Sequence, residues 1–201
     1  MKKTILLTAV ALFVGGMANA QIRIGAGINT GLPMGADATD AELGFGIGAG
    51  ITAEYMLNDN IGVGLNLSNV SFSNEVETTD PLTGISSSTK STLSAMPINL
   101  MANYYFMPGE DFNFYAGLSA GLNMNTLSVE AETMGLSISA DINGNGLGLC
   151  PRIGFNYMFS DNLGLDFNAG YMLNSFTPED AEESGNFSYL PINIGVVYAL
   201  D

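Results

Sequence analysis

The 201-residue chain has no histidine, a single cysteine and only five Lys and Arg residues. Without an imidazole, acid–base catalysis near neutral pH lacks its most common side chain. The single cysteine, Cys150, cannot form an internal disulfide, and no histidine is present to activate it as a nucleophile. We therefore expect no enzymatic activity and no cofactor.

Positive charge is scarce throughout the sequence. Twenty Asp and Glu residues outweigh the five cations, so the formal net charge is -15. An acidic chain repels phosphate groups, which argues against nucleic acid as a partner.

The first 20 residues have the features of an export signal. Lys2 and Lys3 precede a short apolar run at Ile5–Val14, and Ala18-Asn19-Ala20 is a small-x-small cleavage site. The apolar run is shorter than the roughly 20 residues that a membrane-spanning helix requires. We predict a signal peptide over residues 1–20, cleaved after Ala20, and one mature domain over residues 21–201. No lipid-anchoring cysteine follows the cleavage point.

After residue 20 the sequence lacks any apolar run long enough for a membrane helix, but it alternates strongly. Apolar residues occupy every second position in eight runs, as in strands that expose one apolar face. The runs cover about 21–29, 45–57, 61–67, 96–106, 112–124, 147–159, 163–173 and 190–200. Their connections alternate between short turns and long polar loops. The turns are 58–60, 108–111 and 160–162, and the loops are about 30–43, 74–92, 128–145 and 177–186.

This arrangement predicts an all-β fold, an eight-stranded antiparallel up-and-down transmembrane β-barrel. Three places depart from regular alternation. Val70 and Phe72 lie on the opposite phase from the rest of the third run, which predicts a bulge or an early exit from the sheet. Pro97 and Pro151 lie within strands, and we expect bulges or distorted register near them.

The second face of the strands decides between a soluble and a membrane barrel. It is rich in small and weakly polar residues, such as Gly48, Thr52 and Asn66, which suit a crowded barrel interior better than a solvated surface. Aromatic residues gather near the short turns, as expected at one membrane interface. They are Tyr55, Tyr104, Phe106, Phe112, Phe114, Tyr157, Phe159 and Phe167.

Four charged residues fall on the inner face: Arg23, Glu54, Arg152 and Asp166. Unpaired charges in a narrow lumen are costly, so we expect the two cations and two carboxylates to pair. The favoured interpretation is a structural network that plugs the barrel. The alternative is a gated pathway lined by these residues.

The segment Asp141–Gly146 matches the start of an EF-hand loop. Position twelve of such a loop needs a bidentate Glu, but here it is Arg152. We interpret the segment as an Asn/Gly turn before the sixth strand and predict no metal site.

The final run contains Asn193, Gly195, Tyr198 and Leu200, a polar residue, a glycine and two terminal hydrophobic residues. With this run, residues 21–201 resemble the small eight-stranded outer-membrane barrel family, the OmpA transmembrane-domain and OmpX type. The resemblance implies that these residues form an insertion signal, read by the barrel-assembly machinery with the help of periplasmic chaperones. Leu200 stands where the family usually has an aromatic residue, and Asp201 extends beyond it.

The resemblance further implies a monomer in the bacterial outer membrane, among lipids and lipopolysaccharide, with the termini and short turns in the periplasm. Barrel enzymes of this membrane generally use a histidine base, which this chain lacks. The carboxylates of the long loops would then form a solvated acidic surface or capture divalent cations weakly. We expect a structural or surface-interaction role, with a narrow porin-like channel as the alternative; an accessory role in secretion or assembly stays open. The acidic loop residues are Asp37, Asp40, Glu42, Glu75, Glu77, Asp80, Glu130, Glu132, Asp141, Glu179, Asp180, Glu182 and Glu183.

Overall fold

The computed structural model describes residues 21–34, 43–79, 81, 84–133, 136–178 and 185–200. Within them the chain forms β-strands joined by turns, and no helix is long and apolar enough to cross a membrane. The strands are β1 (Ile22–Met34), β2 (Gly46–Met56), β3 (Ile61–Ser68), β4 (Val70–Thr79), β5 (Ser86–Tyr105), β6 (Phe112–Thr133), β7 (Leu136–Met158), β8 (Leu163–Gly170), β9 (Met172–Pro178) and β10 (Gly185–Leu200).

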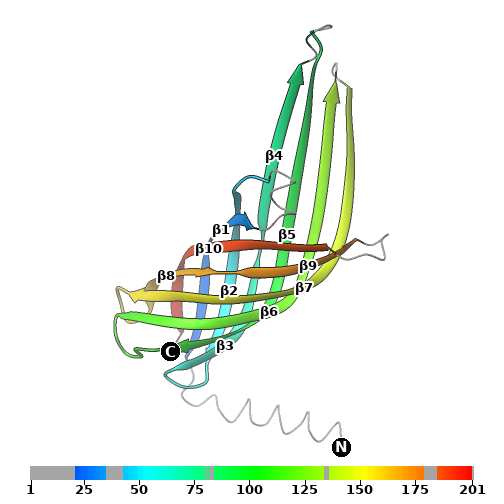
Figure 1. The fold of residues 1–201 in the computed structure, drawn as a ribbon. Coiled ribbons are helices and arrows are strands. Elements are labelled where there is room, and N and C mark those ends of the chain that lie inside the picture. The colour runs from blue at the N-terminus through cyan, green and yellow to red at the C-terminus, as the bar shows by residue number, and fades with distance from the viewer. Residues whose placement is uncertain are drawn as a thin grey trace, which may run out of the picture.

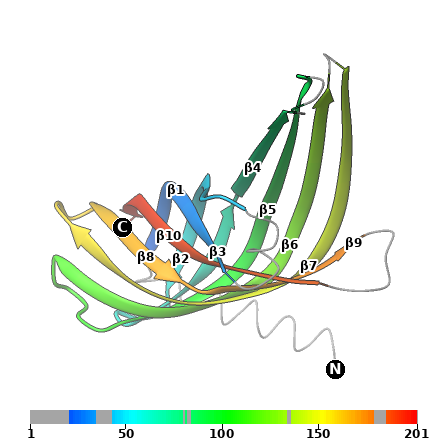
Figure 2. The same cartoon turned by 45° about the horizontal axis from the view of Figure 1, so that its top comes forward.

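The strands close into a ring (Figures 1 and 2). Each strand pairs antiparallel with its neighbours, and β1 pairs with both β2 and β10. One residue, Asn69, separates β3 from β4, and Tyr171 alone separates β8 from β9. Each of these two pairs forms one strand of the ring, so the described chain is an eight-stranded antiparallel up-and-down barrel. The predicted fold class is confirmed.

The strands are strongly staggered around the ring. A path that starts at Ile24 on β1 and steps from each residue to its register partner on the next strand returns to β1 at Met34, ten residues further along. This stagger tilts the strands against the barrel axis. The path runs through Ile24, Ala53, Leu65, Leu100, Ala120, Leu149, Leu173, Ser188 and Met34.

The expected bulges are absent from the described strands. Register continues unchanged from β3 into β4 against both neighbours, so Val70 and Phe72 keep the phase of their strand and point inward. Register is also constant past Pro97 and Pro151. A proline has no N–H to donate to the neighbouring strand. The break between β3 and β4 at Asn69 lies beside Pro97, and the break between β8 and β9 at Tyr171 lies beside Pro151. The prolines therefore interrupt the ladder without shifting it.

The two longest predicted loops are instead strands. The ranges 74–92 and 128–145 continue as β4 with β5 and as β6 with β7, and Figure 1 shows both hairpins rising beyond the rest of the ring. We call residues 71–79, 86–94, 126–133 and 136–143 the outer sheet. The first and last predicted loops are also shorter, since β1 reaches Met34 and β10 starts at Gly185.

Side-chain polarity changes faces where the outer sheet begins. Below this level, large apolar residues point outward, for example Leu100, Leu122 and Ile153. At the boundary the outward row is polar and hydrogen-bonded across strands, Ser71 to Ser94 and Thr126 to Asn143, both at 2.9 Å. On β6 the apolar outward face runs from residue 112 to residue 124, roughly 30 Å along the axis of a tilted strand, which matches a bilayer core.

Candidate functional site

The four charged residues predicted for the interior lie close together in the lower half of the barrel. Arg23 on β1 and Glu54 on β2 are register partners, whereas Arg152 and Asp166 come from β7 and β8. All four line one small cavity. The topology thus gathers side chains from both ends of the sequence.

Glu54 is the centre of the network. Its buried carboxylate accepts hydrogen bonds from the Asn103 amide at 2.7 Å and from the Tyr105 hydroxyl at 2.6 Å. The Arg23 guanidinium lies over the Tyr105 ring, 4.9 Å from its centroid, and donates to Gln21. Gly62 makes room for the carboxylate, because a Cβ at this position would collide with Oε1 of Glu54.

A second unit repeats this arrangement around Asp166. Its carboxylate accepts hydrogen bonds from the Tyr115 hydroxyl at 2.9 Å and from the Asn168 amide at 2.6 Å. The Arg152 guanidinium lies 6.0 Å from the centroid of the Tyr115 ring and donates to Oδ1 of Asn103 at 2.9 Å. Each unit therefore combines a carboxylate, a tyrosine and an arginine.

The expected direct ion pairs are not formed among these four residues. Each carboxylate is linked to an arginine through a tyrosine or asparagine that lies between them. The two units meet where Tyr105 and Tyr115 pack with ring centroids 5.3 Å apart. Sequence reasoning missed the intermediaries because neutral Tyr and Asn carry no signal of pairing. Their position on the inner phase beside predicted charges could have identified them.

In the part of the chain that the structure describes, cavities lie at three levels inside the barrel. An open basin of about 1150 Å³ lies at the short-turn end, where Asp59, Glu110, Asp111 and Asp161 line it. Beyond it, the cavity at the charge network has about 70 Å³ and the next about 40 Å³. The lumen is thus wide at one end and nearly filled by side chains in the middle.

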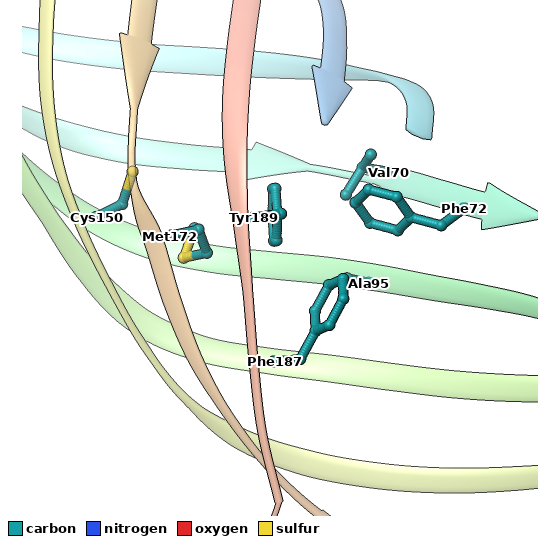
Figure 3. Close-up of a cluster of buried hydrophobic side chains, with 7 residues drawn as sticks. All are labelled: Val70, Phe72, Ala95, Cys150, Met172, Phe187 and Tyr189. Carbon is teal, nitrogen blue, oxygen red and sulfur yellow. The ribbon is translucent and has the colours of Figure 1, made fainter. Parts of the chain in front are cut away.

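At the outer end, apolar side chains fill the barrel. We call this group the aromatic plug: Val70, Phe72, Ala95, Cys150, Met172, Phe187 and Tyr189 (Figure 3). Phe72 is fully buried, and its ring packs edge-on against Phe187 and Tyr189 with centroids 5.3 Å apart in both pairs. Val70 and Phe72, whose phase suggested a bulge, point into this core. Cys150 also points inward.

Beyond the plug, the inner face of β6 and β7 in the outer sheet is apolar but uncovered by the described residues. Leu136 and Ile138 on β7 are 71% and 69% exposed, and Val76 and Ile142 are also exposed. The opposite face carries Ser, Thr and Glu residues, with Lys90 between its register partners Glu75 and Glu130. Among the described residues, no strand pairs with the edge of β7 from residue 136 to residue 143. Within the described residues, β6 and β7 of the outer sheet therefore present an apolar face and an unpaired edge.

The remaining predicted sites are placed as follows. Asn193 and Gly195 face the interior on β10, and Asn193 donates to Asn168 at 2.7 Å. Tyr198 and Leu200 face outward and are exposed. The segment 141–146 is part of β7, paired with β6, rather than the turn we expected.

No group of three or more His, Cys, Asp or Glu residues in the described chain is placed to hold a metal ion. Of the acidic loop residues, Glu75, Glu77, Glu130, Glu132 and Asp141 lie on the outer sheet. The other acidic loop residues lie outside the described residues: Asp37, Asp40, Glu42, Asp80, Glu179, Asp180, Glu182 and Glu183. The predicted signal peptide and Asp201 also lie outside them.

Rings of the predicted aromatic cluster contact one another on the outer surface near the short turns. Phe112 and Phe155 stack at 4.8 Å, Phe155 and Phe167 stack at 5.4 Å, and Tyr104 contacts Phe106. Phe155 was not among the predicted residues. The stacked rings span β6 to β8, as expected of an interfacial aromatic girdle.

Comparison with known proteins agrees with this architecture. Residues 4–199 match the family described as "Outer membrane protein beta-barrel domain". Neisserial surface protein A is 18% identical, with a TM-score of 0.52 over 89% of this chain and 96% of that one. The outer membrane protein OprG from Pseudomonas aeruginosa is 20% identical, with a TM-score of 0.56 over 90% and 96%. At these identities the likeness concerns the fold alone. No curated protein matches the chain.

Proposed function

Because the chain belongs to the outer membrane protein β-barrel family and so lies in the bacterial outer membrane, we propose that it is a non-enzymatic surface-interaction protein. In this proposal the barrel anchors the outer sheet outside the cell, and the interior is a structural plug. Residues 1–20 act as a signal peptide cleaved after Ala20, and the short turns face the periplasm. Lipids and lipopolysaccharide surround a monomeric barrel.

The reversal of polarity in the outer sheet is the observation that carries this proposal. A strand that continued only to close the barrel would need no apolar inner face above the bilayer. Here β6 and β7 place Leu127, Val129, Ile138 and Ile142 on that face, while the outward face becomes polar. Exposed apolar patches on a polar rim and free strand edges are typical of surfaces that bind other proteins.

The chemistry of the outer sheet indicates the kind of partner. An extended segment that pairs with the edge of β7 would place alternate side chains on its two faces. Apolar residues would then lie beside Leu136 and Ile138. Basic residues would lie beside Asp141 on the other face, where long side chains could reach across β7 toward Glu130 and Glu132. The acidic character of the outward face favours a cationic partner.

A binding experiment tests this role. The mature barrel in lipid nanodiscs is used to select ligands from a displayed library of random peptides. We expect the Leu136→Asn/Ile138→Asn variant to bind the selected peptides at least about tenfold more weakly, because it makes the inner face polar. The matched control is Ser137→Asn/Ser139→Asn, which changes the other face of the same strand. Equal affinity in both double variants would contradict the proposal.

The cavities favour one second candidate, a narrow channel for ions or small solutes. A basin of about 1150 Å³ leads toward the charge network, whose carboxylates are held by hydrogen bonds from neutral side chains and not by direct ion pairs, so that they can rearrange. Single-channel recording of the refolded wild-type barrel separates the candidates. A stable conductance altered in Glu54→Gln supports the channel, whereas a silent bilayer supports the plugged barrel.

A further inference from the structure

The three internal cavities follow one another along the barrel. Arg23 and Asn156 line both the basin and the middle cavity. The middle and outer cavities share Arg152 and four asparagines: Asn29, Asn66, Asn168 and Asn193. Four members of the aromatic plug line the outer cavity as well: Val70, Cys150, Met172 and Tyr189. The interior is therefore a series of chambers that ends at the plug.

The chambers below the plug have walls of mixed polarity, to which asparagines contribute much of the polar part. Buried asparagines line them. The side-chain nitrogen Nδ2 of Asn29 and the side-chain oxygen Oδ1 of Asn99 have no hydrogen-bond partner within the protein. An unpaired buried amide is costly, and a cavity of about 40 Å³ is large enough for a water molecule that would satisfy it. The unpaired amide groups and the sufficient volume indicate a hydrated lumen.

The plug is the larger of two buried apolar clusters on this route in the described chain, and Phe72 fits it closely. The smaller cluster, Met56, Tyr105 and Tyr115, lies at the charge network, where both tyrosine hydroxyls donate to carboxylates. A Cβ at Gly31 would lie 2.7 Å from Cζ of Phe72, and one at Gly46 would lie 2.5 Å from Cε1. These glycines are register partners on β1 and β2, so the ring of Phe72 occupies space that side chains would otherwise fill. Narrow apolar constrictions close pores by excluding water.

We propose that Phe72 is a hydrophobic gate, which closes the outer end of a hydrated path for water and small ions. The strand that carries it is held on the β2 side up to Ser73, which accepts a hydrogen bond from the Gly44 N–H at 3.2 Å. From residue 74 onward, no described residue pairs with that edge of β4. Phe72 therefore lies next to the point where β4 leaves the ring, a place where a small strand movement would withdraw the ring. This inference goes beyond the surface role and does not depend on what binds the outer sheet.

Cys150 provides a direct test, since it is the only cysteine of the chain and is buried in the plug. A cationic, membrane-impermeant methanethiosulfonate reagent is added to intact cells, and the labelling rate of Cys150 is measured. We expect slow labelling of the wild type and labelling at least about tenfold faster in Phe72→Ala, because the cavity left by the ring weakens the closed state. Phe187→Ala, which removes an edge-on partner of Phe72, should act in the same direction and serves if Phe72→Ala does not fold.

Phe114→Ala is the matched control, because this phenylalanine faces lipid on β6. It should label as slowly as the wild type, and heat-modifiable gel mobility checks that each variant is folded. The path itself is tested by planar-bilayer recording of Phe72→Ala/Glu54→Gln, for which we expect a stable conductance that the wild type lacks. Rapid labelling of the wild type, unchanged labelling in both folded plug variants, or a silent double variant would each overturn the proposal. Peptide binding by the outer sheet would be unaffected by any of these results.

Discussion

Replacing Glu54 should destabilise the barrel more than any other single carboxylate substitution in the described chain. Glu54 is 6% exposed, and its carboxylate accepts two short hydrogen bonds, from Asn103 and Tyr105. Hydrogen bonds to charged groups contribute about 1.5–3 kcal/mol each. Glu54→Ala removes both and leaves two buried donors unpaired, so we expect the free energy of unfolding to fall by about 3–5 kcal/mol.

Glu54→Gln separates charge from shape. The amide keeps one acceptor but loses the negative charge beside Arg23 and Arg152, so the expected loss is about 1–3 kcal/mol. Adding Arg23→Gln removes the cation that lies over Tyr105. The double variant should therefore be less destabilised than the sum of the single changes, by about 1 kcal/mol or more.

Reversible urea unfolding in lipid vesicles measures these differences, with folded and unfolded barrels separated by gel mobility. The control is Glu110→Gln, an exposed carboxylate in a short turn, which should change stability by less than about 0.5 kcal/mol. If Glu54→Ala were as stable as Glu110→Gln, the network would not be a structural support of the barrel.

Three further predictions concern the membrane position, the packing and the assembly of the barrel. Ile153→Arg places a cation on the lipid face and should cost about 2–4 kcal/mol of unfolding free energy, whereas Ser139→Arg on the outer sheet should be nearly neutral in the same urea titration. Gly62→Ala should cost about 1–3 kcal/mol because its Cβ displaces the Glu54 carboxylate, and equal stability to wild type would contradict the crowding. Tyr198→Ser should lower the folded fraction in cells but not the yield of refolding in detergent; equal losses in both would argue against an insertion signal at the last strand.

Strand number and barrel closure were predictable from the sequence because period-two alternation records which residues face lipid. The short turns were equally clear. In the first turn the Asn58 side chain accepts hydrogen bonds from the N–H groups of Asn60 and Ile61, and in the second Gly109 adopts a positive φ of 83°. These are local effects that nearby residues determine.

The outer sheet was missed because its strands follow a different rule. Apolar and polar residues still alternate there, but the apolar residues now lie on the inner face and the polar residues on the outer face. A search for apolar residues at the lipid-facing positions therefore ends where those positions become polar. Val70 and Phe72 show the consequence, since a change of environment looked like a change of register. Only the unbroken pairing of β3 and β4 with β5 distinguishes the two explanations.

By itself, the sequence determined the eight-stranded barrel, its apolar lipid face and the inward position of Arg23, Glu54, Arg152 and Asp166, because alternation is a local property of an extended chain. Tertiary structure decided how those charges are compensated and where the barrel is closed. Glu54 reaches Arg152 through Asn103, and Phe72 meets Phe187 across the ring, in both cases between residues far apart in the chain. Such contacts depend on the stagger of the strands, which no single stretch of sequence specifies.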